Sequence, residues 1–212
     1  GFAQVEGNGR AVVYPEPFGS PIDFEVMDDD GARELGRTLA SIHLLPPSMI
    51  DDAGLPAYTA EQLRLRLVAE LKDADEASPI PSVLKRRWDA VLGNSSLWDF
   101  TPRVVHGDVA SENFLWSNGS VTTVVGFNES HVGDPASDLA PLLTFGEDFF
   151  AGVQESYEHT VGASLDDAAG ERAQFHSEYA LVRWLMFGKR TSNTQIVSEA
   201  RDMLSDLATQ ID

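Results

Sequence analysis

The stretch from residue 103 to residue 125 constrains the fold most, because its hydrophobic pattern differs from that of the surrounding chain. Val104-Val105 is typical of a short buried strand. Two apolar runs then flank residues 117–120, whose central Asn118-Gly119 is the strongest short signal of a β-hairpin. Outside this stretch, apolar residues recur mostly at helical spacing. The sequence therefore predicts an α+β fold that is mostly helical, with one inserted β-hairpin.

Helix signals lie on both sides of that stretch. Asp30 is expected to cap a helix that ends before Pro46-Pro47, and residues 59–62 form a capping box that opens a second helix. A third helix is expected to close at Gly93. After Pro135 the chain is expected to be helical to its end.

The first residues predict another β-hairpin. Apolar runs at residues 2–5 and 11–14 flank Gly7-Asn8-Gly9, where the glycines allow the positive φ of a tight turn. Pro15 and Pro17 then favour an extended connector. The open edge of this hairpin could pair with a second copy of the chain, so a homodimer is one expected assembly.

The charge excludes several classes of partner. The chain has 15 Lys and Arg against 34 Asp and Glu, which gives a formal net charge of −19. Such a molecule repels nucleic acid and anionic membrane surfaces and attracts cationic small molecules, although high charge also favours solubility alone. No apolar run is long enough to span a bilayer and no charged leader opens the chain, so a cytoplasmic protein is expected.

The chemistry-bearing motif runs from His106 through Asp108 to Asn113, with the pattern H-x-D-x-x-x-x-N. Phosphoryl transfer needs a carboxylate that orients and deprotonates the attacking hydroxyl, and an oxygen ligand that holds magnesium against the nucleotide phosphates. Asp108 suits the first role and Asn113 the second. The loop between them is long enough for both side chains to face one cleft.

Two further segments accompany this motif. Residues 39–43 read Leu-Ala-Ser-Ile-His, and residues 133–140 read Gly-Asp-Pro-Ala-Ser-Asp-Leu-Ala. Together with the H-x-D-x-x-x-x-N loop, they resemble the aminoglycoside and macrolide phosphotransferases of the protein-kinase-like superfamily. The resemblance implies that residues 25–212 form the large, helical C-terminal lobe with its catalytic-loop hairpin. It also implies that residues 1–24 form a two-strand remnant of the small lobe and the hinge.

The resemblance further implies roles for individual residues. Asp108 would be the catalytic base, His106 would shape the loop through hydrogen bonds, and Asn113 would bind Mg2+. The hinge would bind the base of ATP or GTP through Glu16 or Phe18. The reaction would be O-phosphorylation of small hydroxylated molecules, cationic ones included, as in antibiotic resistance.

The same resemblance assigns structural roles to Asp134 and Asp138, with Asp138 as an ordinary carboxylate at a helix start. Two departures from the family pattern stand against these matches. Gly126 occupies the position of an aspartate that binds magnesium, and glycine has no ligand atom, so Glu129 or Asn128 would have to substitute. No Lys-bearing strand precedes the connector, so a truncated and impaired enzyme is expected.

Three functional hypotheses therefore stay open. The first is an ATP- or GTP-dependent phosphotransferase. The second is a non-catalytic kinase homologue that acts as a binding or scaffolding protein, because the magnesium aspartate is missing. The third is a metal hydrolase, since H-x-D and H-x-x-D patterns supply ligands to a divalent metal. Its ligands would be His106, Asp108, His131 and Asp134.

Overall fold

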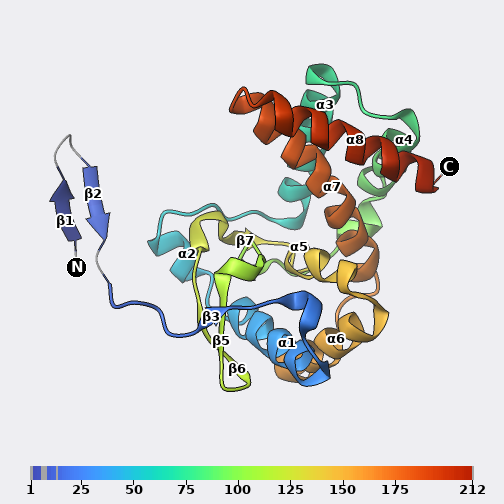
Figure 1. Cartoon of the computed structure of the whole chain (residues 1–212). Helices are drawn as coiled ribbons and strands as arrows, with labels where there is room; N and C mark the ends of the chain where they lie inside the picture. Colours follow the sequence, from blue (N-terminus) through green and yellow to red (C-terminus); the bar gives the residue numbers. More distant parts are fainter. Residues whose placement is uncertain (1, 6–8, 13, 212) are drawn as a thin grey trace.

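The computed structural model describes residues 2–5, 9–12 and 14–211. The strands are β1 Phe2–Val5, β2 Gly9–Val12, β3 Ser20–Pro21, β4 Arg103–Val105, β5 Phe114–Ser117, β6 Ser120–Val124 and β7 His131–Gly133. The α-helices are α1 Asp29–His43, α2 Ser48–Asp52, α3 Ala60–Ala77, α4 Ser82–Gly93, α5 Ala136–Leu139, α6 Glu147–Val161, α7 Ala169–Arg190 and α8 Thr194–Ile211 (Figure 1). Short 3-10 helices cover Phe24–Val26, Ser95–Trp98, Ser111–Asn113, Phe127–Glu129 and Ala140–Phe145. The predicted α+β class, mostly helical, is confirmed.

The strands form small antiparallel sheets. β5 and β6 make the predicted hairpin, in which Asn118 and Gly119 adopt φ of 53° and 83°, as a type I′ turn requires. β3 adds to the outer edge of β5, and β4 pairs with β7. β1 pairs with β2, so the first predicted hairpin is present, but its second strand is Gly9–Val12 and not residues 11–14, and Gly9 pairs with Val5 and is not a turn residue. The predicted turn residues Gly7 and Asn8 lie outside the described residues, and the homodimer stays a prediction.

The helices pack into two bodies with separate hydrophobic cores (Figure 1). The first, here called the sheet body, packs α1 and α6 against β3–β7, with Leu35, Phe114 and Val153 fully buried. The second, the helix body, packs α3, α4, α7 and α8 around Trp88 and Tyr179. α7 also contacts α5, so this helix links the two bodies. Among the described residues, each helix is either too short or too polar to cross a lipid bilayer.

Helix starts follow local capping chemistry, with one correction. The predicted capping box is present, because Thr59 and Gln62 exchange side-chain to backbone hydrogen bonds. The prediction of Asp30 as the cap of α1 is wrong, because Asp28 accepts the hydrogen bond from the backbone N–H of Gly31 at 3.0 Å. Asp28 has the extended backbone that a cap needs, whereas Asp30 already lies in the first turn.

The predicted boundary between a small-lobe remnant and the large lobe falls close to the sheet-body core. Ile22 and Phe24 are 5% exposed and pack in that core with residues of α1 and α6. The division at residues 24 and 25 stays a prediction. The end of the predicted small-lobe remnant, residues 1–24, thus contributes side chains to the core of the sheet body.

Candidate active site

His106 anchors the start of the predicted catalytic loop from a fully buried position. Its Nδ1 lies 3.2 Å from the backbone N–H of Asp108, which donates to it. Nε2 therefore carries the proton and donates to the carbonyl of Val125 at 2.8 Å. Both ring nitrogens are used, so His106 positions the loop and is not placed to move a proton.

Asp108 and Asn113 come together as the motif predicted. The Asn113 amide donates to the Asp108 carboxylate at 2.9 Å and to its backbone carbonyl at 3.0 Å. Asn113 is buried at 8% exposure, whereas Asp108 is exposed. The Asn113 amide thus holds the Asp108 carboxylate on one side, and the other side of the carboxylate is open to solvent.

Asp138 holds this loop from behind, so its interpretation as an ordinary carboxylate at a helix start is wrong. The side chain accepts hydrogen bonds from the backbone N–H groups of His106 at 2.7 Å and Gly107 at 2.9 Å. Gly107 adopts φ of 82°, and a Cβ there would overlap the carbonyl oxygen of Glu129. The loop therefore needs both the Asp138 acceptor and a glycine at position 107.

His43 completes this buried network. Its Nε2 lies 3.0 Å from the Asp138 carboxylate, and its Nδ1 lies 2.8 Å from the Tyr157 hydroxyl. Burial opposes the charge of Asp138, but the hydrogen bonds from His43, Gly107 and His106 outweigh it and lower the Asp138 pKa. Burial raises the pKa of Tyr157 to about 12, so this hydroxyl stays protonated and donates to His43. The sequence signal of this network was the joint presence of Leu-Ala-Ser-Ile-His and Asp-Leu-Ala.

Asp134 belongs to a second buried network. It accepts from the backbone N–H of Ala136 at 3.0 Å, which fixes the turn before α5 as expected. Arg172 bridges Asp134 at 2.8 Å and Asp166 at 2.7 Å, and His176 lies 3.2 Å from Asp134. No local pattern identified Arg172 or His176, because they are 38 and 42 residues away along the chain.

The metal-hydrolase hypothesis is wrong. Asp134 pairs with Arg172 and His176, and both nitrogens of His106 are used within the loop. His131 turns its Nδ1 to the carbonyl of Glu129 at 2.8 Å. Across residues 2–5, 9–12 and 14–211, no group of three or more His, Asp or Glu side chains is arranged to hold a metal ion.

The residues around Gly126 do not fit a magnesium site of the family type. Gly126 adopts φ of 81°, and a Cβ there would overlap the Asn113 amide. Asn113 directs its amide N–H groups to Asp108, and Glu129 lies beside Gly107 on the exposed side of the loop. Asn113 and Glu129 as magnesium ligands stay a prediction.

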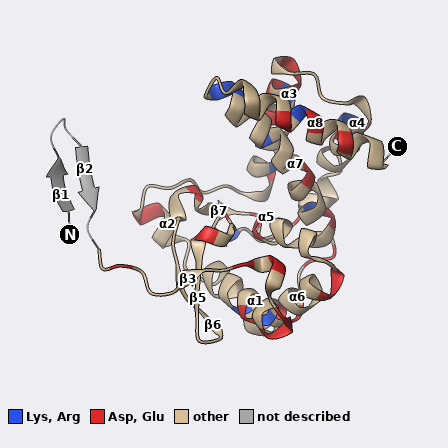
Figure 2. Ribbon diagram, in the orientation of Figure 1, with Lys and Arg blue, Asp and Glu red and all other residues tan. Residues whose placement is uncertain are grey.

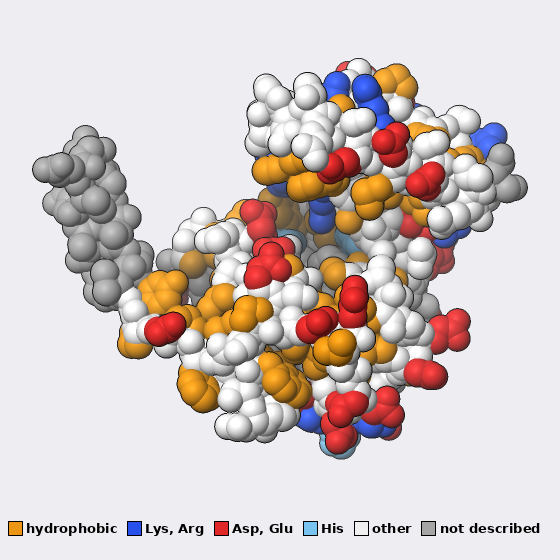
Figure 3. Space-filling model, in the orientation of Figure 1, with side chains coloured by type: hydrophobic (Ala, Val, Ile, Leu, Met, Phe, Trp, Pro, Cys, Tyr) orange, Lys and Arg blue, Asp and Glu red, His pale blue; other side chains and the backbone are white. Residues whose placement is uncertain are grey.

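A large groove opens in front of Asp108. Its volume is about 780 Å³, and its lining joins Gly107, Asp108 and Glu129 of the sheet body to α3 and α7 of the helix body. Figure 3 shows the hollow between the two bodies. The groove is large enough for a drug-sized molecule. A hydroxyl placed at its inner end would lie against the Asp108 carboxylate.

The predicted nucleotide-binding residues lie on the connector, away from the lining of this groove. Glu16 and Phe18 are exposed, and Phe18 is fastened to the hairpin because its carbonyl accepts from Thr123 Oγ1 at 3.0 Å. Within the described part of the chain, the backbone N–H groups of Glu16 and Phe18 have no hydrogen-bond partner. The assignment of these two residues to the nucleotide base stays a prediction.

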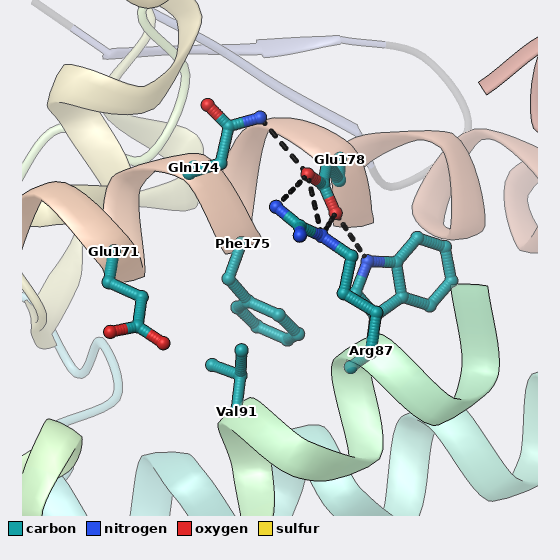
Figure 4. Close-up of a pocket in the computed structure, with 7 residues that line it drawn as sticks. Arg87, Val91, Glu171, Gln174, Phe175 and Glu178 are labelled. Carbon is teal, nitrogen blue, oxygen red and sulfur yellow. Dashed lines mark hydrogen bonds and ion pairs between the residues drawn. The ribbon is translucent and has the colours of Figure 1, made fainter. Parts of the chain in front are cut away.

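A small cavity of about 70 Å³ lies between α4 and α7 (Figure 4). Glu178 is buried on its wall and accepts from Arg87 at 2.9 Å and from the Trp88 indole at 2.8 Å. Gln174 adds a third donor at 3.0 Å. Because side chains of α4 and α7 donate all of these hydrogen bonds, the Glu178 carboxylate links the two helices and has a structural role.

Comparisons with known proteins agree with this geometry. The model of the Phosphotransferase enzyme family matches residues 18–176. Viomycin phosphotransferase from Streptomyces vinaceus is 35% identical over 77 residues, which cover 34% of this chain and 25% of that protein. The chain thus spans about a quarter of the length of this relative.

Solved structures share the fold over most of the chain. The macrolide 2'-phosphotransferase MphH from Brachybacterium faecium superposes with a TM-score of 0.80 at 21% identity, over 90% of this chain and 68% of its own. The GDP complex of aminoglycoside 2'-phosphotransferase-IIIa gives 0.78 at 20% identity, over 99% and 74%. A type I macrolide 2'-phosphotransferase gives 0.78 at 26% identity, over 84% and 61%.

The family model covers three quarters of the chain, and it includes the Asp108 loop and the Asp138 segment that supports it. The structural relatives confirm the predicted protein-kinase-like fold, a mostly helical lobe with a short inserted hairpin. The chain therefore belongs to the phosphotransferase enzyme family.

Proposed function

We propose that this chain provides the catalytic and acceptor-binding lobe of an ATP- or GTP-dependent O-phosphotransferase for small hydroxylated molecules, antibiotics among them. The observation that carries the proposal is the Asp108 carboxylate, which Asn113 holds at 2.9 Å and which faces a groove of about 780 Å³. The relatives named viomycin, macrolide and aminoglycoside phosphotransferase support this class of acceptor, and the GDP complex supports a nucleotide donor.

The reaction follows from the position of Asp108. The acceptor hydroxyl lies at the inner end of the groove and donates a hydrogen bond to the carboxylate, which orients the oxygen for attack. The acceptor oxygen forms a bond to the γ-phosphorus while the bond from that phosphorus to the bridging oxygen breaks. The hydroxyl proton passes to Asp108, and the nucleoside diphosphate leaves.

Substitution of Asp108 by Asn tests this proposal. The amide cannot accept the proton, so phosphate transfer should fall by about 100-fold or more. The assay follows transfer from radiolabelled ATP and GTP to a panel of hydroxylated aminoglycosides, macrolides and viomycin. The control is Glu112→Gln, which removes an exposed carboxylate from the same loop and should leave the rate unchanged. Equal rates for wild type and Asp108→Asn would refute the role of Asp108.

Gly126 favours a second candidate function, a non-catalytic homologue that binds small molecules or partners. Glycine supplies no metal ligand, so we expect turnover to be impaired even where the fold is intact. Calorimetry of ATP and GTP binding, with and without magnesium, separates the two functions. Magnesium-dependent binding supports the transferase, whereas nucleotide binding indifferent to magnesium, without transfer, supports the homologue. Gly126→Asp is a poor test, because its Cβ would displace Asn113.

A further inference from the structure

The outer half of the groove differs in charge from the rest of the molecule. Away from Asp108 and Glu129, the charged lining residues are Arg66, Arg183 and Arg190 against Glu70 and Asp73. Three cations and two carboxylates give this half a net charge of +1, within a chain of −19. Figure 2 shows acidic residues spread over both bodies. The attraction of cationic molecules that is expected from the net charge therefore does not extend to the outer half of the groove.

Two arginines in the C-terminal half of α7, Arg183 and Arg190, lie against aromatic rings. Arg183 lies over the ring of Tyr179 and Arg190 over the ring of Phe187, each with its guanidinium carbon 5.8 Å from the ring centroid. Among the described residues, neither arginine has a carboxylate within ion-pair distance, whereas Arg66 pairs with Glu70 at 2.7 Å. The two guanidinium groups are thus oriented by aromatic rings and stay available to an anionic ligand.

An aromatic surface lies between these two arginines. The rings of Trp184 and Phe187 stack at 5.5 Å with an interplanar angle of 9°, and each side chain is 39% exposed. Both residues line the groove. Rings held in this way lose little conformational entropy when a flat ligand packs on them.

The Tyr179 hydroxyl adds a second polar feature. Tyr179 lines the groove and is 1% exposed, yet within the described part of the chain its hydroxyl has no hydrogen-bond partner. A buried hydroxyl without a partner destabilises the fold. In a groove wall such a hydroxyl can gain its missing partner from a bound ligand.

We propose that the outer half of the groove selects an acceptor that carries a flat apolar ring next to an anionic group, such as a carboxylate. The ring packs on Trp184 and Phe187, and the anion pairs with one of the two arginines that flank these rings, Arg183 or Arg190. The inference rests on the proposed function only in treating the groove as the acceptor site. It assigns to this chain a substrate class that the acidic composition does not suggest.

Binding of two probes with the same ring tests the proposal. 2-Naphthoate and 2-naphthylmethylammonium are titrated into the 15N-labelled chain, and the indole N–H signal of Trp184 is followed by NMR after assignment with Trp184→Phe. Naphthoate should shift this signal and bind at least about tenfold more tightly than the ammonium probe. The double variant Arg183→Gln, Arg190→Gln should weaken naphthoate binding by at least about tenfold.

The matched control is Arg86→Gln, which removes an exposed arginine from α4 outside the groove and should leave naphthoate binding unchanged. Equal or tighter binding of the ammonium probe would overturn the proposal. So would unchanged naphthoate binding in the double variant, or no shift with either probe. If the wild-type chain binds naphthoate in this way but transfers no phosphate to any acceptor, the proposed function is refuted and this inference stands.

Discussion

At the scale of single residues, the site combines one exposed carboxylate with a buried frame. Asp108 is exposed, whereas Asp138, His106 and His43 are at most 2% exposed. Hydrogen bonds among the buried groups and from Asn113 give the exposed carboxylate a defined position, and within the described part of the chain it has no ion pair. Pre-organisation of this kind lets a catalytic carboxylate act without first being reoriented.

The frame predicts a large effect of Asp138→Asn. The Asn side chain has no negative charge and carries N–H groups of its own. The backbone N–H groups of His106 and Gly107, which donate to Asp138 at 2.7 and 2.9 Å, would therefore lose part of their acceptor. We expect the free energy of unfolding to fall by about 2–3 kcal/mol and phosphate transfer to fall with it. Urea denaturation measures the first effect. The control is Asp167→Asn, which lies in an exposed loop. An equally small change in the free energy of unfolding of both variants would contradict the structural role of Asp138.

At the scale of elements, the sheet body depends on the close approach of α1 and α6. Gly36 of α1 faces α6 so closely that a Cβ would overlap Ser156 Oγ and the carbonyl oxygen of Val153. Backbone atoms cannot move aside as a flexible side chain can. The separation of these two helices is therefore set by the absence of a side chain at position 36.

Two alanine substitutions test this packing. Gly36→Ala should destabilise the protein by about 1–3 kcal/mol, because the added methyl group pushes α1 and α6 apart. Gly170→Ala, in the first turn of α7, has nothing within 4 Å of its new Cβ. It should be neutral or stabilise the protein by up to about 1 kcal/mol, because alanine restricts the unfolded chain. Thermal unfolding of both variants measures the difference, and equal melting temperatures would contradict this account of the interface.

At the scale of the whole molecule, three buried carboxylates connect distant segments. Asp134 pairs with Arg172, Asp138 with His43 and Glu178 with Arg87. Burial opposes each negative charge, but hydrogen bonds from the neighbouring donors outweigh it and lower each pKa. A lowered pKa in the folded state means stability that is present above the pKa of the unfolded chain and is lost as pH falls.

Stability should therefore change little between pH 7 and about pH 5, and fall steeply below about pH 4, where unfolded carboxyl groups titrate. Protonation of exposed carboxylates acts in the opposite direction, because it relieves the repulsion within a chain of −19. We expect the buried groups to dominate, since solvent and salt screen the exposed ones. Urea midpoints from pH 7 to pH 3 measure the profile, and a midpoint that stays constant to pH 3 would contradict it. Asp138→Asn should show a shallower acid transition.

The sequence by itself determined the features whose physics is local. Asn118-Gly119 specified the β5–β6 turn, because only residues that tolerate positive φ fit a type I′ turn. Residues 59–62 specified the start of α3, because a capping box closes within four residues. The spacing of Asp108 and Asn113 specified their meeting, because one short loop carries both. The sequence also indicated the family.

Only the tertiary structure decided which residues from distant segments support and surround the site. Asp138 could have been a simple helix-start carboxylate, and its bonds to His106 and Gly107 exist because the fold brings the loop after β4 to α5. Arg172 carries no local pattern, because its partner Asp134 lies 38 residues away. The arginines and rings of α7 contact one another within four residues, but only the tertiary structure places them in one groove with Asp108. Packing of the two cores, not short-range stereochemistry, brings these distant segments together.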